Sequence, residues 1–543
     1  MPSTPSLTEA MSLEECLGQV FMVGFPGTTV TPEIIDLIKN EHIGGLVLFS
    51  RNLEHANQIQ TLTTQLQAIA REAGHRYPLL ISVDQENGMV RRFGESATVF
   101  PGNMTLGAIG STEMTREVAQ ATGREMAALG INMNLAPVAD VNNNPANPVI
   151  GIRSFGEDAQ EVGRHVAAMV AGYRDAGIIT CLKHFPGHGD TAVDSHLALP
   201  SVPYTLERLE KLELIPFKQG IAAGADSIMI AHLALPALMS ADELFPATLS
   251  PVVVHDLLRQ KMGYQGVIIT DCLEMNAVSE TVGVPDGAVM ALQAGNDLIL
   301  VSHQYPRQKG SLEAVRNALR TGKLSEQTIR SASERILNLK AHTLSWEKLP
   351  DQADLALISN SAHQQLRDRA YEQSTTLVRD QQKLLPLHLT AEQRLLVLLL
   401  QPDAYTVAAD KSAAGNIFIE QIRQHHAQVE SITVTSQNAA EIQQGIDQTV
   451  SGFAMIIVVT VNANLDQYQG DFVRHVLQTT KPTIGLAVYN PYDLLAFPQL
   501  GSYLVTYEYT APALGAAVRV LFGEVAAHGK LPVSLPGLYP LAR

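Results

Sequence analysis

The sequence predicts an α/β protein, with an N-terminal (β/α)8 TIM-like barrel followed by a C-terminal open α/β (αβα) sandwich domain. Three observations support this fold class. Short apolar runs alternate with amphipathic stretches over the first 340 residues, ionisable residues stand at the ends of several runs, and a second set of runs begins after residue 354. A chain of 543 residues is also long enough for about two to four domains.

The predicted barrel depends on eight apolar runs. Continuous apolar runs with helical crossovers between them are typical of buried parallel strands, and eight such strands close a barrel. Residues 161–176 and 204–223 are examples of the helical patterns in between. The runs are QVFMVGF (19–25), GGLVLF (44–49), LLISVD (79–84), MNLAPV (133–138), IITCLK (178–183), SIMIAH (227–232), GVIITD (266–271) and DLILVS (297–302).

Ionisable residues at the ends of these runs predict where a site lies. In a (β/α)8 barrel the active site is built at the carboxyl ends of the strands. A long polar loop, DVNNNPANPVIGIRSFGED, also follows the fourth run and holds Arg153, and loops of this length are usually functional. The residues at the ends of the runs are Asp84, Lys183, His184, His232 and Asp271.

The second part of the chain predicts an open, doubly wound sheet. It contains no GxGxxG, no GxxxxGK[ST] and no cluster of carboxylates or histidines, so no motif assigns it a chemistry. We expect the barrel over residues 1–345, a linker and domain entry over 346–375, and the sandwich over 376–543. Its apolar runs are 395–400, 431–435, 455–461, 483–489 and 502–509.

Composition excludes several classes of partner. The net charge of −16 argues against nucleic acid and against an anionic membrane surface. Three cysteines provide no disulfide framework or zinc ribbon, and no apolar run approaches the roughly 20 residues of a membrane span. Because no secretory signal is evident, we expect a cytoplasmic protein, although a secreted form with its signal trimmed would look the same.

The stretch KHFPGHGDTAVDSH (183–196) concentrates histidines and aspartates, and three interpretations are open. A zinc helix needs HExxH, and Pro186 with its neighbouring glycines prevents a regular helix here. A phosphate-binding loop would need a GK[ST] motif, which this stretch lacks. Proton transfer fits better, because Asp194 and His196 flank one residue and an aspartate orients a histidine and raises its pKa. The alternative is that the neighbouring carboxylate only holds a loop histidine in place and that the pair has no catalytic role.

Asp271 ends an apolar strand, which predicts a rigid carboxylate aimed into the barrel mouth. A carboxylate opposite a proton donor is what cleavage of a glycosidic bond with retention requires. Charged residues nearby would form strong hydrogen bonds to sugar hydroxyls. The residues expected in that role are Asp84, Arg92, Arg153, Lys183 and His184.

These motifs resemble the β-N-acetylhexosaminidases of glycoside hydrolase family 3, in particular their two-domain members. The matching segments are GGLVLF (44–49), SVDQENG (82–88), LAPVADV (135–141), RSFGED (153–158), KHFPGHGDTAVDSH (183–196), IITDCLEM (268–275), TTLVRDQQKLLPL (375–387), NPYDLLAF (490–497) and VLFGEVAAHGKLPVSLP (520–536). The DSH element indicates the hexosaminidase branch, because the β-glucosidase branch uses a glutamate instead, often from the second domain.

The resemblance implies a role for each candidate. Asp271 matches the family's nucleophile, and His196 matches the acid/base, assisted by Asp194. The residues implied to hold the terminal N-acetylglucosamine are Asp84, Arg92, Arg153, Lys183 and His184. The family uses no metal and no organic cofactor, so none is expected.

Two departures from the family pattern concern the pocket. The family often reads VDQEGGRV where this chain has VDQENGMV, with Asn87 for glycine and Met89 for arginine. We expect the rim of the sugar pocket, and hence the leaving-group preference, to differ there. Cys272 follows the nucleophile where other branches carry tryptophan, and we interpret it as a packing residue without a redox role.

The sequence favours a retaining exo-β-N-acetylglucosaminidase that hydrolyses terminal non-reducing N-acetylglucosamine from cell-wall fragments or chitooligosaccharides. The expected partner is a small carbohydrate, not nucleic acid or membrane. Two alternatives are a phosphorylase that uses the same site and a non-catalytic sugar-binding protein. The aglycone, the role of the C-terminal domain, the oligomeric state and the source organism are left open.

Overall fold

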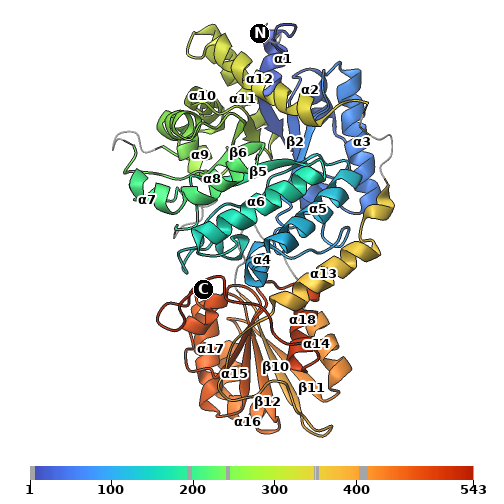
Figure 1. Cartoon of the computed structure of the whole chain (residues 1–543), viewed down its shortest axis with the longest axis vertical. Coiled ribbons are helices and arrows are strands. Elements are labelled where there is room, and N and C mark those ends of the chain that lie inside the picture. Colours follow the sequence, from blue (N-terminus) through green and yellow to red (C-terminus); the bar gives the residue numbers. More distant parts are fainter. Residues whose placement is uncertain are drawn as a thin grey trace.

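The structure, a computed structural model, describes residues 6–191, 199–239, 245–347, 349, 354–402 and 414–541. It contains an eight-stranded sheet in the N-terminal part and a six-stranded sheet in the C-terminal part. Figure 1 shows the two parts stacked along the long axis of the molecule, with the second sheet below the barrel. The predicted fold class is confirmed.

The first sheet is parallel throughout, with the order β7-β6-β5-β4-β3-β2-β1-β8. A parallel bridge between Ile269 and Leu298 joins the two outermost strands and closes the barrel. Each strand coincides with one of the eight apolar runs and is buried along its whole length, as the runs predict. The strands are β1 (Phe21–Val23), β2 (Gly45–Leu48), β3 (Leu80–Val83), β4 (Met133–Asn134), β5 (Ile179–Phe185), β6 (Ser227–Ile230), β7 (Val267–Thr270) and β8 (Ile299–Val301).

Helices cover the outside of the barrel (Figure 1). They are α1 (Leu13–Gln19), α2 (Pro32–Lys39), α3 (Ala56–Glu72), α4 (Asn103–Ile109), α5 (Thr112–Ala128), α6 (Ala159–Asp175), α7 (Leu206–Lys211), α8 (Leu214–Ala222), α9 (Asn276–Ser279), α10 (Val284–Ala294), α11 (Tyr305–Arg320) and α12 (Glu326–Thr343), with a π-helix over Val252–Lys261. Among the described residues, we find no helix with both the length and the apolarity needed to cross a membrane.

The helical pattern predicted over 204–223 is two helices, α7 and α8, that break at Leu212. The cause is Pro216. Proline has no backbone N–H to donate to the carbonyl four residues earlier, so a continuous helix cannot pass through this point. The chain begins a new helix at Leu214, which places Pro216 in the first turn, where a donor is not needed.

The second sheet has the order β11-β10-β12-β13-β14-β9. The five predicted apolar runs form its parallel strands, β10 (Leu395–Leu400), β11 (Val429–Val434), β12 (Met455–Thr460), β13 (Thr483–Ala487) and β14 (Ser502–Val505). The sixth strand, β9 (Thr376–Asp380), pairs antiparallel with β14 at the edge. It escaped prediction because an exposed edge strand lacks the continuous apolar run that marks its neighbours.

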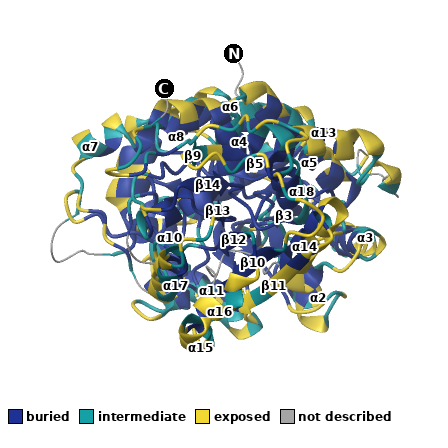
Figure 2. Ribbon diagram, turned by 90° about the horizontal axis from the view of Figure 1, so that it is seen from below, coloured by how far each residue is buried: buried dark blue, intermediate teal, exposed yellow. Residues whose placement is uncertain are grey.

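Helices flank this second sheet on both faces, which gives the predicted sandwich. They are α14 (Ala414–His425), α15 (Ala439–Gln444), α16 (Ile446–Ser451), α17 (Gln467–Gln478) and α18 (Ala511–Leu521). Figure 2 views the molecule from the side of this sheet, with buried strands at the centre and exposed residues on the outer helices. Between the two parts lies α13 (Ser361–Ser374), which contacts α4 and α5 of the barrel and α18 of the sandwich.

The two parts share packing. The larger apolar cluster fills the barrel, and a second cluster surrounds the strands of the sandwich. Four residues from barrel loops and α4 belong to the second cluster, namely Met89, Met104, Ala108 and Ile152. The loops at the carboxyl ends of the barrel strands are therefore packed against the second sheet, close to the position where the sequence predicts a site.

Candidate active site

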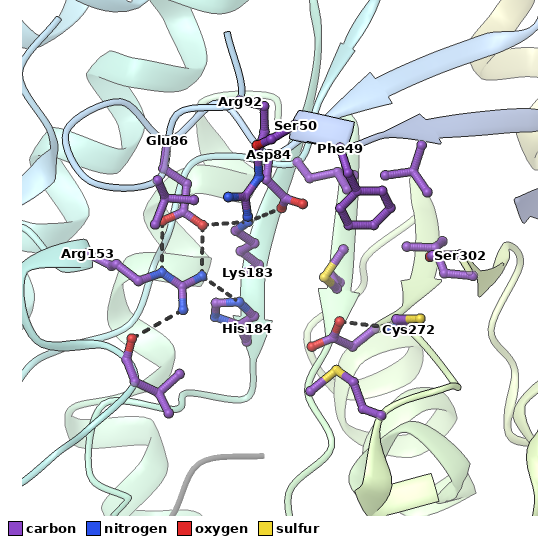
Figure 3. Close-up of a pocket in the computed structure, with 18 of the residues that line it drawn as sticks. Phe49, Ser50, Asp84, Glu86, Arg92, Arg153, Lys183, His184, Cys272 and Ser302 are labelled. Atoms are coloured by element: carbon purple, nitrogen blue, oxygen red, sulfur yellow. Dashed lines mark hydrogen bonds and ion pairs between the residues drawn. The ribbon is translucent and has the colours of Figure 1, made fainter. Parts of the chain in front are cut away.

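A cavity of about 350 Å³ lies at the carboxyl ends of the barrel strands. Every candidate site residue that falls within the described part of the chain lines it, namely Asp84, Arg92, Arg153, Lys183, His184 and Asp271. Figure 3 labels all of these except Asp271. These residues come from the carboxyl ends of four strands, β3, β4, β5 and β7, or from the loops that follow them, and are brought together only by closure of the barrel. The candidate proton-transfer residues Asp194 and His196 lie outside the described residues.

One wall of the cavity is a network of alternating charges (Figure 3). The guanidinium of Arg153 donates from Nε to Glu86 Oε2 at 2.9 Å and from Nη2 to Oε1 at 2.8 Å. Lys183 Nζ lies 2.7 Å from Glu86 Oε1 and 2.6 Å from Asp84 Oδ1. Two cations and two carboxylates thus hold one another in place on the side of the cavity formed by β3 and β5.

Burial and pairing set the charge states in this wall. Burial by itself would raise the pKa of Glu86, but the charges of Arg153 and Lys183 outweigh it and hold that pKa well below its usual range. Burial would lower the pKa of Lys183, yet Asp84 and Glu86 raise it above its usual value. Both groups are therefore ionised at neutral pH, and the wall presents fixed donors and acceptors to a ligand.

His184 is oriented by a buried aspartate. Asp140 Oδ2 accepts from His184 Nδ1 at 2.7 Å, and Arg153 Nη2 lies 3.3 Å from His184 Nε2. Because the carboxylate only accepts and the guanidinium only donates, these partners favour the tautomer of His184 that carries its proton on Nδ1. Asp140 also accepts from the backbone N–H of His188 at 2.7 Å, so one carboxylate orders the start of the loop that follows β5.

The beginning of the loop after β5 is held in place by a side chain from the loop after β4. Asn147 Nδ2 donates to the carbonyls of His188 and Gly189, at 2.9 Å each. His188 Nδ1 lies 2.8 Å from the hydroxyl of Thr191, and burial lowers the pKa of His188 to about 4. His188 is consequently neutral at physiological pH. The segment with Asp194 and His196 begins next along the chain.

Asp271 follows β7 on a rigid backbone. Its N–H donates to Ile230 O at the end of β6 at 3.1 Å, and its Oδ1 accepts from the N–H of Cys272 at 2.7 Å. The carbonyl of Cys272 is bound in turn by His232 Nε2 at 2.9 Å. His232, which the sequence also places at a strand end, is buried and does not line the cavity. It fixes the turn that presents Asp271.

The remainder of the cavity is largely apolar. Side chains from β2, β6 and β8 and from neighbouring loops form this part, namely Val47, Leu135, Val149, Met229, Met275 and Leu300. Phe49 and His303 also line the cavity, with ring centroids 5.1 Å apart. A sugar ring has hydroxyls around its edge and C–H groups on its faces, so a cavity with one charged wall and one apolar wall fits it.

Sequence reasoning missed two carboxylates in this site, Glu86 and Asp140. Both stand in segments that carry the family resemblance, SVDQENG and LAPVADV, and each lies two residues after the end of a predicted strand. The available signal was the excess of nearby cations: buried Arg153 and Lys183 require anionic partners, and Asp84 alone could not serve both.

The expectation for Asn87 and Met89 is wrong, because neither residue lines the cavity. Asn87, at φ 69°, donates to Thr122 Oγ1 at 3.1 Å and accepts from Gln85 Nε2 at 3.0 Å. Met89 belongs to the apolar cluster of the second sheet. The two departures from the family pattern are therefore explained by packing behind the site.

Cys272 is buried, and burial raises the pKa of its thiol to about 11, as a packing role requires.

Within the described residues, one group of side chains has metal-ligand spacing: Cys272, Glu274 and His303. Its members are already engaged. Both oxygens of Glu274 accept backbone N–H groups, from His303 at 2.5 Å and from Gln304 at 3.1 Å, and Arg51 Nη1 lies 3.1 Å from His303 Nδ1. A cation would have to displace the backbone N–H groups from Glu274 and compete with the Arg51 charge, so we assign no metal there.

Comparison with known proteins identifies relatives over nearly the whole chain. The family described as "Glycosyl hydrolase family 3 N terminal domain" matches residues 12–339. Beta-hexosaminidase A of Pseudoalteromonas piscicida is 32% identical over 561 aligned positions, which cover 94% of this chain and 92% of that protein.

Two solved structures resemble the fold throughout. A glycoside hydrolase family 3 β-N-acetylglucosaminidase from Paenibacillus sp. str. FPU-7 superposes with a TM-score of 0.89 at 39% identity, covering 97% of this chain and 99% of that one. A fungal multi-domain family 3 β-N-acetylglucosaminidase superposes with a TM-score of 0.91 at 44% identity, covering 97% of this chain but 61% of that longer one.

Proposed function

We infer the function of this chain from its family: it belongs to glycosyl hydrolase family 3. It is a glycoside hydrolase, and we propose that it is a retaining, exo-acting β-N-acetylglucosaminidase. The proposed substrates are cell-wall fragments and chitooligosaccharides with a terminal, non-reducing N-acetylglucosamine. The observation that carries the proposal is the position of Asp271 in the same cavity as the charged wall of Arg153, Glu86, Lys183 and Asp84.

In the first step, the carboxylate of Asp271 attacks the anomeric carbon, and the bond from that carbon to the glycosidic oxygen breaks. The imidazolium of His196, which we propose is assisted by Asp194, gives its proton to the leaving oxygen, so the aglycone departs as a neutral alcohol. The product on the enzyme is a covalent glycosyl ester. The strand end and the Cys272 N–H that fix the Asp271 carboxylate keep it aimed at the reacting carbon.

In the second step, His196 takes a proton from water, whose oxygen attacks the anomeric carbon and displaces Asp271. Two inversions at that carbon return the original β configuration. We assign Lys183, Asp84, Arg153, His184 and Arg92 to the hydroxyls of the terminal sugar. A cavity of about 350 Å³ has room for one terminal sugar, which supports exo-action.

The first experiment measures hydrolysis of 4-nitrophenyl β-N-acetylglucosaminide and of di-N-acetylchitobiose, with and without inorganic phosphate. Wild type is compared with His196→Ala and with His255→Ala, a control at an exposed histidine of the π-helix. Wild type is expected to hydrolyse both substrates without phosphate and to release the β anomer first by NMR. His196→Ala is expected to slow chitobiose more than the nitrophenyl glycoside, because a good leaving group needs less protonation.

Other outcomes would change the proposal in defined ways. Turnover that requires phosphate and produces the sugar 1-phosphate would replace hydrolysis by phosphorolysis at the same residues. Initial release of the α anomer would exclude the retaining mechanism. If wild type turns over neither substrate but binds N-acetylglucosamine, a sugar-binding protein without catalysis would be the better description.

A further inference from the structure

The carboxyl ends of the second sheet are covered by a barrel loop. In open α/β sheets this edge is where ligands bind. Here Asn464, after β12, donates from Nδ2 to Pro145 O at 3.0 Å, and Tyr492, after β13, accepts from Asn142 Nδ2 at 3.0 Å. Pro145 and Asn142 belong to the long loop that carries Asn147 and Arg153. The second sheet therefore holds a loop of the active site where other proteins with this fold hold a ligand.

Glu508, after β14, makes a third connection, which is also buried. Its side chain is 1% exposed. Oε1 accepts from the backbone N–H of Gly102 and from the hydroxyl of Thr105, at 2.5 Å each, and Oε2 accepts from the hydroxyl of Tyr371 at 2.7 Å. One carboxylate thus fastens the start of α4 in the barrel to the sandwich and to α13.

Two short paths lead from this carboxylate to the sugar-binding wall. Along the first, Asn103, the residue after Gly102, donates from Nδ2 to the carbonyl of Arg153 at 2.6 Å. Along the second, the turn after Glu86 packs against the same point. At Gly88, a Cβ would lie 2.9 Å from Gly102 Cα and 3.1 Å from Glu508 Oε1, so the contact leaves no room for a side chain.

We propose that Glu508 is a positioning residue through which the C-terminal sandwich holds the substrate-binding pair Arg153 and Glu86 in register. This inference rests on the proposed function, because it assigns the pair to the sugar. The carboxylate fixes Gly102; Gly102 fixes both Asn103 and Gly88; and these two set the backbone of Arg153 and of Glu86. The sandwich then acts on the site without contributing a residue to the cavity, since no described residue beyond 303 lines it.

A general stabilising role for the interface would have different consequences. The ion pair of Arg369 on α13 with Glu117 on α5, at 2.8 Å, also joins α13 to the barrel, as Glu508 does through Tyr371, but it lies on the exposed surface away from the cavity. If Glu508 merely held the two parts together, removal of either contact would lower stability without a specific effect on sugar binding. If Glu508 positions the site, removal of Glu508 weakens sugar binding and removal of the Arg369 ion pair does not.

The test measures the inhibition constant of N-acetylglucosamine, which occupies the terminal-sugar site alone, against hydrolysis of 4-nitrophenyl β-N-acetylglucosaminide. Glu508→Ala is expected to raise the constant roughly tenfold, because small displacements of binding groups are costly. Glu508→Gln keeps an acceptor for Gly102 and Thr105 and is expected to stay within about threefold of wild type. Arg369→Ala is the matched control. It is expected to leave the inhibition constant unchanged, because an exposed ion pair contributes little to stability and this one lies away from the cavity.

A double-mutant cycle tests the path. If Glu508 acts through Asn103, the effects of Glu508→Ala and Asn103→Ala on the inhibition constant are less than additive. Should Glu508→Ala fail to fold, Thr105→Val removes one of the two bonds to Oε1 without leaving a cavity and is expected to raise the constant by a smaller factor.

Three results would overturn the inference: an unchanged constant in a folded Glu508→Ala (or, if that variant is unfolded, in Thr105→Val), an equal rise in Arg369→Ala, or full additivity in the cycle. Failure of the proposed function would look different, because wild type itself would then neither hydrolyse the glycoside nor bind N-acetylglucosamine. The wild-type measurements therefore separate the two.

Discussion

Arg153 and Glu86 face each other through two parallel hydrogen bonds, and the two side chains are 8% and 3% exposed. Parallel contacts of this kind fix both distance and orientation, more firmly than a single ion pair does. Lys183 shares the same carboxylate. The cations of the site are thus held in position before a sugar arrives, so binding does not have to order them.

Glu86→Gln is expected to be strongly destabilising. A glutamine presents N–H groups where Arg153 and Lys183 also donate, and it removes the carboxylate that pairs directly with both buried cations. Breaking a buried pair by removal of one partner costs about 3–5 kcal/mol of unfolding free energy. Urea unfolding measures the loss, and Glu161→Gln, in an exposed pair with Arg164, is the control, expected within about 0.5 kcal/mol of wild type. Equal losses in the two variants would contradict the importance of burial.

Asp271→Gly is expected to lower turnover by on the order of 10⁴-fold or more, as loss of a nucleophile does. Azide is expected to restore turnover of the nitrophenyl glycoside, because the vacated space lets it attack the anomeric carbon from the same side as the missing carboxylate. The product is then the α-glycosyl azide, identified by NMR. Asp256→Asn, at an exposed carboxylate, is the control. A β-azide, or rescue without any glycosyl azide, would count against Asp271 as the nucleophile.

Three buried histidines make stability depend on pH. Burial lowers the pKa of His75, His165 and His188 to about 4. In the unfolded chain each titrates near about 6.5, so between these values the unfolded state binds more protons. Stability is therefore complete above about pH 6.5 and is lost as pH falls toward 4, by about 2 kcal/mol for each histidine from pH 7 to pH 5.

His165→Gln tests this dependence away from the cavity. His165 lies 2.8 Å from Thr115 Oγ1 and stacks on Phe155, so glutamine keeps a hydrogen-bonding group but cannot be protonated. Urea unfolding of both proteins between pH 5 and pH 7 is expected to show a shallower pH dependence in the variant. Two parallel curves would mean that His165 is protonated normally in the folded protein.

Cys272 is expected to be unreactive at neutral pH although it lines the cavity. Burial raises the pKa of its thiol to about 11, so only about one molecule in 10⁴ carries the thiolate at pH 7. Inactivation by iodoacetamide should accelerate about tenfold for each pH unit between 7 and 10, and N-acetylglucosamine should protect. Cys272→Ala removes the inactivation. Rapid inactivation of wild type at pH 7 would show that the thiol is not desolvated.

Much of the fold follows from local patterns in the sequence. The eight apolar runs of the barrel and the five of the sandwich are strands, because a parallel strand covered on both faces must be apolar along its whole length. The edge strand β9 and the break before Pro216 were not predicted. β9 is only partly buried and carries no continuous apolar run. Pro216 divides a helical pattern of twenty residues into two helices.

The candidate site divides in the same way. Asp84, Lys183, His184 and Asp271 could be identified because each follows a predicted strand, and the barrel rule places strand ends together. Glu86 and Asp140 have no such local mark, because a loop carboxylate that is a buried partner looks the same in sequence as a solvated charge. Only the excess of predicted cations pointed to a further carboxylate such as Glu86. The expectation for Asn87 and Met89 failed for a related reason: motif position alone does not tell which side of a turn faces the cavity.

The sequence by itself determined the order and type of the strands and the set of residues at their ends, because hydrophobic periodicity and turn chemistry act over a few positions. Only the tertiary structure decided the pairing of Arg153 with Glu86, 67 residues apart, and the contact of Glu508 with Thr105, 403 residues apart. Hydrogen bonds and ion pairs form wherever folding brings complementary groups within about 3 Å, and that proximity is a property of the packed chain rather than of any segment of it.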